Sequence, residues 1–351
     1  MRLLPVLTAV LLLAGCGAEA SAKAPFTAVV LPSGAVPVRI AAAGDVLYVA
    51  VSKDGKPGML RYEKGRATEI SLTPATPYGR MAEWQSLAAD GTEIVAVGSK
   101  TGGAHGNPRW SLWRTKGTGL AEQPQKFSAF GGYGAGSLVD VVLPTTGPLL
   151  VGVWQSATTG SDVAVWTTDG TLWNRQSSAG TPLESTQDSL KFPLGATAHG
   201  ADALIAGWQF AEGRQQPVVW TLRDGVATLT PLPDAGKNGM AITVSCTDTC
   251  AVAGRVDGSL AIWRQSGNAW RRVSDVPDVP VGDHERPVPP VGDTLVYSDR
   301  SVVRVATLGG DASDAAGPTG VVTAITRVHD TTYVLAGPDK DNQTLWRAGP
   351  S

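Results

Sequence analysis

The 351-residue sequence is poor in charged residues and has no excess of either sign. Charged residues make up 17% of the chain, and its 29 basic and 31 acidic side chains give a formal net charge of −2. Binding to nucleic acid requires a strongly basic surface field. The composition therefore predicts that nucleic acid is not a partner.

Motifs for catalysis or cofactor binding are also missing. The four histidines, at positions 105, 199, 284 and 329, are scattered along the chain. The glycine-rich run at residues 131–136 lacks the Lys-Ser/Thr ending of a phosphate-binding loop. We therefore predict no cofactor, no metal site and no catalytic residues, and we consider enzymatic activity the less favoured interpretation.

Long hydrophobic runs are absent except at the N-terminus. Residues 1–16 read MRLLPVLTAVLLLAGC, in which Arg2 precedes an apolar run over residues 3–13. A basic residue followed by a short apolar run is typical of a secretory signal peptide. The run is far short of the roughly 20 apolar residues that cross a bilayer. Its last four residues, LAGC, resemble a lipobox, where bacterial signal peptidase II cuts once the cysteine is acylated.

This resemblance to bacterial lipoproteins implies three segments. Residues 1–15 are a signal peptide that is removed, and residues 16–25 are the lipidated Cys16 with a flexible tether of small, polar residues. Residues 26–351 are the folded domain. The resemblance places the protein at the extracytoplasmic face of a cell membrane, with the membrane as a partner through the lipid. An ordinary signal peptide with an incidental cysteine remains the alternative.

Only two cysteines remain after Cys16. Cys246 and Cys250 lie four residues apart in the sequence CTDTC. In an exported protein this pair predicts a local disulfide that closes a tight turn between two strands. A zinc site is the alternative, but two cysteines with no nearby histidine make a poor zinc cage.

Glycine, proline and tryptophan are abundant, and they recur with a pattern. The chain has 42 Gly, 24 Pro and 11 Trp, a composition typical of a turn-rich β protein. Seven times, an apolar strand ending in a small residue leads through a loop to a second strand, which usually carries tryptophan. Four of these tryptophans, at positions 113, 166, 220 and 263, are 53, 54 and 43 residues apart.

This repeat predicts an all-β fold, a β-propeller of seven four-stranded blades. The last unit ends near Trp346 without a fourth strand, whereas an orphan strand at residues 26–31 precedes the first unit. We expect the orphan to close the ring as the outer strand of the last blade, which would protect exposed edges. An open solenoid or two sandwiches are the alternatives.

One segment resembles a known propeller motif. Residues 168–173, TDGTLW, are similar to the Asp-box of sialidases, with one residue fewer between Asp169 and Trp173. Together with the repeat, this resembles sialidase-type and YVTN/WD40-like propellers, although the Gly-His and Trp-Asp pairs of WD40 blades are absent. A sialidase would also need an arginine cluster and a Tyr–Glu pair, and no such pattern is seen. The resemblance implies a fold, and function does not follow from it.

Candidate ligand-binding residues come from the longer loops between the second and third strands of blades 2, 3 and 4. Two Trp-Gln pairs, at 154–155 and 208–209, occupy equivalent positions in successive blades of the predicted repeat. Tryptophan offers a flat apolar face and glutamine both donates and accepts hydrogen bonds, which suits carbohydrate or peptide. Packing of these tryptophans between blades is the alternative. The candidate residues are Trp154, Gln155, Trp208, Gln209, Arg214, His105 and Arg109.

These patterns together predict a lipid-anchored, extracytoplasmic propeller that acts as a non-catalytic binding or scaffolding module. Its ligand would be an envelope protein, a peptide or a glycan. The alternative is a sialidase-like, glycan-active hydrolase. A hydrolase predicts arginines or paired carboxylates at the mouth of the central channel, whereas a binding module predicts an aromatic and amide surface.

Overall fold

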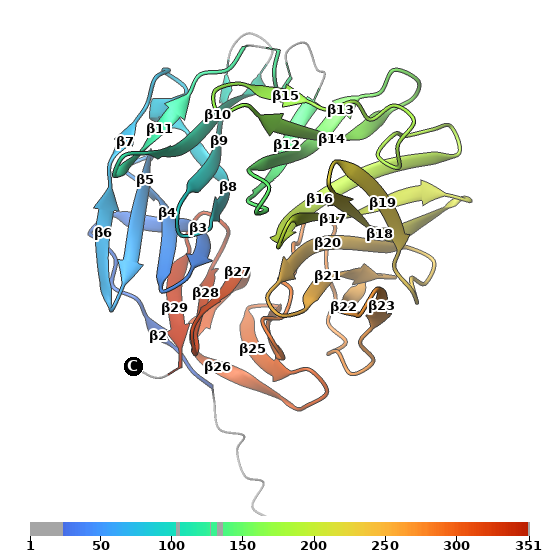
Figure 1. The fold of residues 1–351 in the computed structure, drawn as a ribbon. Coiled ribbons are helices and arrows are strands. Elements are labelled where there is room, and N and C mark those ends of the chain that lie inside the picture. The colour runs from blue at the N-terminus through green and yellow to red at the C-terminus, as the bar shows by residue number, and fades with distance from the viewer. Residues whose placement is uncertain (1–23, 103–105, 127, 132–135, 350–351) are drawn as a thin grey trace, which may run out of the picture.

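The computed structural model describes residues 24–102, 106–126, 128–131 and 136–349. Their 29 strands form seven sheets arranged around a ring (Figure 1). The chain is a seven-bladed β-propeller. Six sheets have four strands and one has five, which confirms the predicted fold. Among the described residues the one helical element is the short 3-10 helix η1 (Gly79–Met81).

The first three blades follow one another in chain order. Blade 1 contains β3 (Ala35–Ala43), β4 (Val46–Lys53), β5 (Lys56–Glu63) and β6 (Arg66–Ile70). Blade 2 contains β8 (Glu83–Ala89), β9 (Ile94–Gly102), β10 (Asn107–Lys116), β11 (Gly119–Gln123) and an added outer strand, β7 (Leu72–Thr73). Blade 3 contains β12 (Gly136–Val142), β13 (Leu149–Gln155), β14 (Ser161–Thr168) and β15 (Trp173–Arg175).

The remaining four blades complete the ring. Blade 4 contains β16 (Ser189–His199), β17 (Asp202–Ala211), β18 (Arg214–Arg223) and β19 (Val226–Pro231). Blade 5 contains β20 (Gly239–Cys246), β21 (Cys250–Val256), β22 (Ser259–Ser266) and β23 (Ala269–Arg272). Blade 6 contains β24 (Thr294–Asp299), β25 (Val302–Thr307), β26 (Ala312–Thr319) and β1 (Ala24–Pro25). Blade 7 contains β27 (Val321–Val328), β28 (Thr331–Gly337), β29 (Thr344–Ala348) and β2 (Thr27–Ala28).

The N-terminal strands close the ring. β2 pairs antiparallel with β29, and the Val29 N–H donates to the Leu345 carbonyl at 2.8 Å. The predicted closure is therefore confirmed. The structure adds a contact that the sequence did not reveal, because β1 pairs in parallel with β26 of the neighbouring blade. The last two residues of the expected tether, Ala24 and Pro25, thus belong to a sheet.

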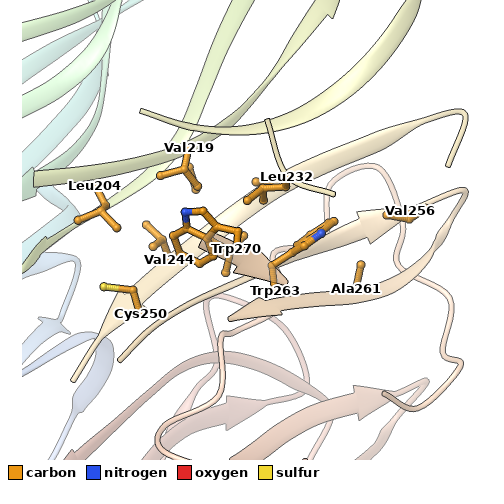
Figure 2. Close-up of a cluster of buried hydrophobic side chains, with 12 residues drawn as sticks. Leu204, Val219, Leu232, Val244, Cys250, Val256, Ala261, Trp263 and Trp270 are labelled. Carbon is orange, nitrogen blue, oxygen red and sulfur yellow. The ribbon is translucent and has the colours of Figure 1, made fainter. Parts of the chain in front are cut away.

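The core is divided among the interfaces between blades. Seven clusters of buried apolar side chains occur, and each joins two neighbouring blades around the ring. Figure 2 shows the cluster between blades 4 and 5, where Leu204 and Val219 face Val244 and Trp263. Because each blade covers both of its faces in this way, no single blade has a hydrophobic core of its own.

The repeated tryptophans hold the chain where it passes from blade to blade. Four of those in the third strands, Trp113, Trp166, Trp220 and Trp263, are fully buried. In three blades the indole N–H donates to a backbone carbonyl in the connection that enters the same blade, at 2.8 to 3.0 Å. The donor and acceptor pairs are Trp166 and Ala129, Trp220 and Pro182, and Trp263 and Pro233. This role explains why tryptophan recurs with the blade.

The inner strands carry a repeated irregularity. In every blade except the sixth, the pairing of the first strand with the second shifts by one residue near the middle of the first strand. Such bulges bend a strand and redirect the side chains that follow. In blade 6, the Pro-rich residues 287–290 run along the channel in place of an inner strand, since proline cannot donate to a strand ladder.

Candidate functional site

The two predicted Trp-Gln pairs do not occupy equivalent positions. Gly152 in blade 3 and Gly207 in blade 4 serve as reference points. Each pairs with the inner-strand residue just before the shift in strand register. Trp154 follows its glycine by two residues, whereas Trp208 follows its own by one. Because side chains alternate along a strand, a difference of one residue reverses the face. The equivalence inferred from the sequence is therefore wrong, and the two indoles leave opposite faces of their blades.

Trp154 faces blade 2. Its ring centroid lies 6.1 Å from that of the buried Trp166, in an edge-to-face arrangement. The guanidinium carbon of Arg175 lies over the same ring, 4.7 Å from the Trp154 ring centroid, close enough for a cation–π interaction. Trp154 stays partly exposed and lines a pocket of about 240 Å³ between blades 2 and 3.

This pocket, which we call the Trp154 pocket, combines an apolar base with cationic and amide groups. Its lining holds two cations, Lys126 and Arg175, and no acidic side chain among the described residues. The Gln125 side-chain oxygen accepts a hydrogen bond from the backbone N–H of Trp173 at 3.0 Å, which fixes one wall of the pocket. The lining residues are Gln125, Lys126, Ser128, Ala129, Trp154, Leu172, Trp173, Asn174 and Arg175.

No sequence pattern indicates the two cations. Lys126 comes from the connection into blade 3 and Arg175 from its fourth strand, so both are about 20 to 30 residues from Trp154. Neither lies in a loop between a second and a third strand, where the sequence predicts the ligand-binding residues. The resulting pocket has the features of a small binding site, with an apolar base and a few polar groups that converge on it.

Trp208 and its neighbours make their contacts within blade 4. The Trp208 ring stacks on Phe192 of the adjacent strand, with centroids 4.1 Å apart and planes at 15°. The Ser189 hydroxyl donates to Gln209 Oε1 at 3.2 Å, and Arg214 forms an exposed ion pair of 3.5 Å with Glu212. These contacts are consistent with a structural role in the hairpin.

The other candidates lie at separate places. Arg109 is in β10, with its guanidinium carbon 6.0 Å from the Tyr78 ring centroid. Gln155 ends β13 and is exposed. His105 and the lipidation candidate Cys16 lie outside the described residues. Of the six predicted ligand-binding residues that the structure describes, only Trp154 lines the pocket.

A larger cavity of about 420 Å³ lies at the centre of the ring. Inner strands and the Pro-rich segment line it, mostly with alanine, threonine and aliphatic side chains. Its charged lining residues are Asp140, from blade 3, and Arg286, from the connection between blades 5 and 6. Arg39 of blade 1 interacts electrostatically with both.

Asp140 connects three neighbouring blades. Asp140 follows the register shift in β12. Its carboxylate accepts hydrogen bonds from the Ser86 hydroxyl, from the Val141 N–H at 3.0 Å and from the Ala196 N–H at 3.0 Å. Burial raises the pKa of Asp140, while these donors and Arg286 oppose that shift. The carboxyl group is therefore held by blades 2, 3 and 4.

Both arginines also bind backbone carbonyls. Arg39 donates to Gln85 at 2.7 Å, and Arg286 donates to Leu194 at 2.6 Å. Burial lowers the pKa of each guanidinium, and the nearby Asp140 opposes that effect. We call Asp140, Arg39 and Arg286 the channel cluster. Its three members are far apart in the sequence, at positions 39, 140 and 286, so no local sequence pattern indicated the cluster.

The buried carboxylates do not form a pair for glycoside hydrolysis. Such chemistry needs two facing carboxyl groups, and Asp140 is the one acid among the described residues of the cavity lining. Glu122 accepts the Ala75 and Thr76 N–H groups at 2.6 and 2.7 Å. Asp162 accepts from the Ser185 N–H at 2.8 Å. Both acids hold loops in place.

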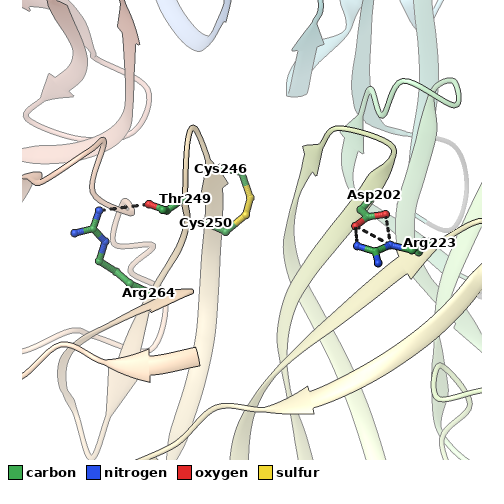
Figure 3. Close-up of a disulfide and its surroundings, with 6 residues drawn as sticks. All are labelled: Asp202, Arg223, Cys246, Thr249, Cys250 and Arg264. Carbon is green, nitrogen blue, oxygen red and sulfur yellow. Dashed lines mark hydrogen bonds and ion pairs between the residues drawn. A yellow bond between two sulfur atoms is a disulfide. The ribbon is translucent and has the colours of Figure 1, made fainter. Parts of the chain in front are cut away.

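The predicted disulfide is present between Cys246 and Cys250, which pair directly across the β20–β21 hairpin (Figure 3). The structure corrects one premise about this pair. No histidine is near it in the sequence, but His199 at the end of β16 is near it in space. The imidazole nitrogen and both sulfur atoms lie within 4.8 Å of one another.

In the described part of the chain, no helix is long and apolar enough to cross a membrane.

The Asp-box-like segment forms the turn between β14 and β15. There Asp169 accepts the N–H groups of Thr171 and Leu172, both at 3.0 Å, which lowers the pKa of its carboxyl group. The aspartate of this motif therefore has a turn-forming role.

Comparison with known proteins gives no family. No family model and no curated protein matches the sequence. Solved structures do match, including the β-propeller domain of Cps50 (Swd1) from Myceliophteria thermophila, with a TM-score of 0.60, 10% identity, and coverage of 93% of this chain and 100% of that domain. The likeness is one of fold.

Two enzymes match in the same way. The phage phi92 endosialidase has a TM-score of 0.50 and 11% identity, covering 94% of this chain and 69% of the endosialidase. A Mycobacterium tuberculosis puromycin-hydrolyzing peptidase has a TM-score of 0.55 and 14% identity over 94% of this chain. The match covers 55% of that peptidase, so this chain spans about half its length. The loose resemblance to sialidase-type and WD40-like propellers is confirmed at the level of fold.

Proposed function

We propose that this propeller is a lipid-anchored, extracytoplasmic binding module without catalytic activity, recognising a protein, peptide or glycan of the cell envelope. The observation that carries the proposal is the Trp154 pocket. It joins a partly exposed indole to Lys126 and Arg175 at an interface between blades. Tryptophan and arginine are the residue types that most often dominate binding energy.

The charge of the pocket favours a ligand that carries a carboxylate. Two cations line it and no acid does among the described residues, so an anionic group would meet an uncompensated positive field. The amide side chains of Gln125 and Asn174 add hydrogen-bonding capacity. An acidic glycan or an acidic peptide segment fits these features best.

The arrangement of the chain is compatible with an anchor at Cys16. Seven residues lie between Cys16 and Ala24, so eight Cα–Cα steps join them and the tether reaches at most about 28 Å. The described N-terminal strands pair with blades 6 and 7, while the Trp154 pocket lies between blades 2 and 3, across the ring (Figure 1). An anchor near the membrane would therefore leave the pocket accessible.

Replacement of Cys16 by alanine is expected to abolish lipidation, because the thiol that would carry the lipid is lost. Parent and Cys16→Ala chains, expressed in a lipoprotein-processing bacterium, would be compared by metabolic labelling with a tagged fatty acid. We expect label on the parent, with residues 1–15 removed, and an unlabelled, uncut variant. A Ser21→Ala variant controls for changes in the tether, and a parent without label, or a labelled Cys16 variant, would refute the anchor.

Binding through the pocket is tested with Trp154→Ala and Arg175→Gln. The probes are acidic oligosaccharides and acidic peptides, each paired with its neutral methyl ester, with affinity measured by calorimetry. We expect binding of the acidic member of a pair, and a loss of about 2 kcal/mol, or about thirtyfold in Kd, in each variant.

Trp208→Ala is the matched control, since this indole lies on another blade and stacks on Phe192. It should bind as the parent does. Equal affinity of the parent and the Trp154 variant, or a preference for the neutral esters, would contradict the proposed pocket. Turnover of any probe would contradict the absence of catalysis.

A further inference from the structure

Three potential metal ligands lie together at the hairpin that carries the disulfide, two from the hairpin itself and one from the neighbouring blade. Cys246 and Cys250 face each other across β20 and β21, so reduction would leave two thiols side by side on one rigid hairpin. His199 comes from blade 4, where it ends β16 and is exposed. The ligand atoms of all three residues lie within 4.8 Å of one another.

We propose that reduction of this disulfide creates a binding site for a zinc-class divalent cation, with Cys246, Cys250 and His199 as ligands. Two thiolates and one imidazole are donors that zinc prefers, and a water molecule would complete a tetrahedron. Ligand atoms in such a tetrahedron lie closer together than 4.8 Å. Side-chain rotation about the freed sulfurs and the exposed imidazole supplies that adjustment.

A carboxylate group lies beside His199, because His199 pairs with Asp202 across the β16–β17 hairpin. Asp202 is itself held by Arg223, whose Nε donates to it at 2.9 Å (Figure 3). A carboxylate close to a ligating histidine is a common outer partner in zinc sites, where it orients the ring.

The chemistry of the switch balances with one co-reactant, a dithiol reductant. The reductant gives two electrons and two protons to the disulfide, which yields two cysteine thiols while the reductant forms its own disulfide. The metal ion then displaces the two thiol protons and binds the thiolates. In the oxidised protein both sulfur atoms are engaged with each other, so the site exists only after reduction.

The test uses the full chain as purified after expression, in detergent, with Co²⁺ as a spectroscopic probe for zinc. After reduction with a phosphine, we expect one Co²⁺ per chain, thiolate-to-cobalt charge-transfer absorption and the visible bands of a tetrahedral site. Zn²⁺ should displace the cobalt. The oxidised chain should show none of these signals.

Variants assign the ligands. His199→Ala should weaken Co²⁺ affinity by more than about tenfold, since even outer partners of zinc ligands contribute about that much. The Cys246→Ser/Cys250→Ser double variant should lose the charge-transfer band. His329→Ala is the matched control, because His329 also lies at a hairpin turn but pairs with Asp45 at 2.8 Å.

Two results would overturn the proposal. One is the absence of cobalt–thiolate absorption in the reduced parent, with its fold confirmed by circular dichroism. The other is equal Co²⁺ affinity of the parent and the His199 variant, which would remove the imidazole from the site. Neither result depends on the Trp154 pocket or on the lipid anchor.

Discussion

Replacing Trp220 with alanine is expected to lower the free energy of unfolding by about 3–5 kcal/mol. Trp220 is fully buried at the interface of blades 3 and 4. Its indole N–H also donates to the Pro182 carbonyl at 3.0 Å, which fixes the connection into blade 4. Alanine would leave a large cavity and free that connection. The measurement is urea unfolding followed by far-ultraviolet circular dichroism.

Two further variants separate the contributions of volume and hydrogen bond. Trp220→Phe keeps most of the apolar volume but removes the donor to Pro182, and we expect it to cost clearly less than alanine. Phe210→Ala, on the same blade, removes a side chain that is 44% exposed and should change stability by less than about 1 kcal/mol. A Trp220→Ala variant as stable as Phe210→Ala would contradict a structural role for the repeated tryptophans.

Replacing Asp140 with alanine is expected to cost about 2–3 kcal/mol of unfolding free energy. The variant leaves the Ala196 N–H without its acceptor, leaves the Val141 N–H with only the Ser86 hydroxyl as acceptor, and removes the counter-charge of Arg286. Solvent in the cavity can reach Arg286, so we expect less than the full cost of breaking a deeply buried ion pair.

Asp140 should also make stability depend on pH. Burial raises the pKa of its carboxyl group in the folded state above the usual value of about 3.9. A raised folded pKa gives stability that is fully present below the unfolded pKa and is lost as the pH rises through the folded pKa. The free energy of unfolding of the parent, relative to Asp140→Asn, should therefore fall as the pH rises through that window.

The control for the channel cluster is Asp275→Ala, at an exposed position near the connection into blade 6. It should change stability by less than about 0.5 kcal/mol and leave the pH dependence intact. If Asp140→Ala were as stable as this control, the channel cluster would have no structural role. A parent stability that rises with pH relative to Asp140→Asn would contradict the raised pKa.

The fold followed from local patterns that repeat. Each blade needs four short strands, and four blades carry a fully buried tryptophan in the third strand. The sequence repeats these features, and it shows the missing strand after Trp346. The pairing of β1 with β26 was not foreseen, because two residues carry no periodic signal. The replacement of an inner strand by residues 287–290 became clear only when the register was known.

The binding residues were harder to predict, since they depend on which side chains face one another. Trp154 and Trp208 look alike in the sequence, but their strands are offset by one residue relative to the inner-strand irregularity. That offset places their side chains on opposite faces. Lys126 and Arg175 join Trp154 only because separate strands and connections meet at the interface of blades 2 and 3.

The sequence alone determined the all-β class, the seven-fold repeat, the closure by an N-terminal strand and the disulfide between Cys246 and Cys250. These features depend on alternation, turn residues and short spacings, which are local properties of the chain. Only the tertiary structure decided which distant groups meet. It joined His199 to the cysteine pair, Arg175 to Trp154, and Asp140 to Arg286. Contacts between blades depend on register and ring geometry, and no local pattern encodes them.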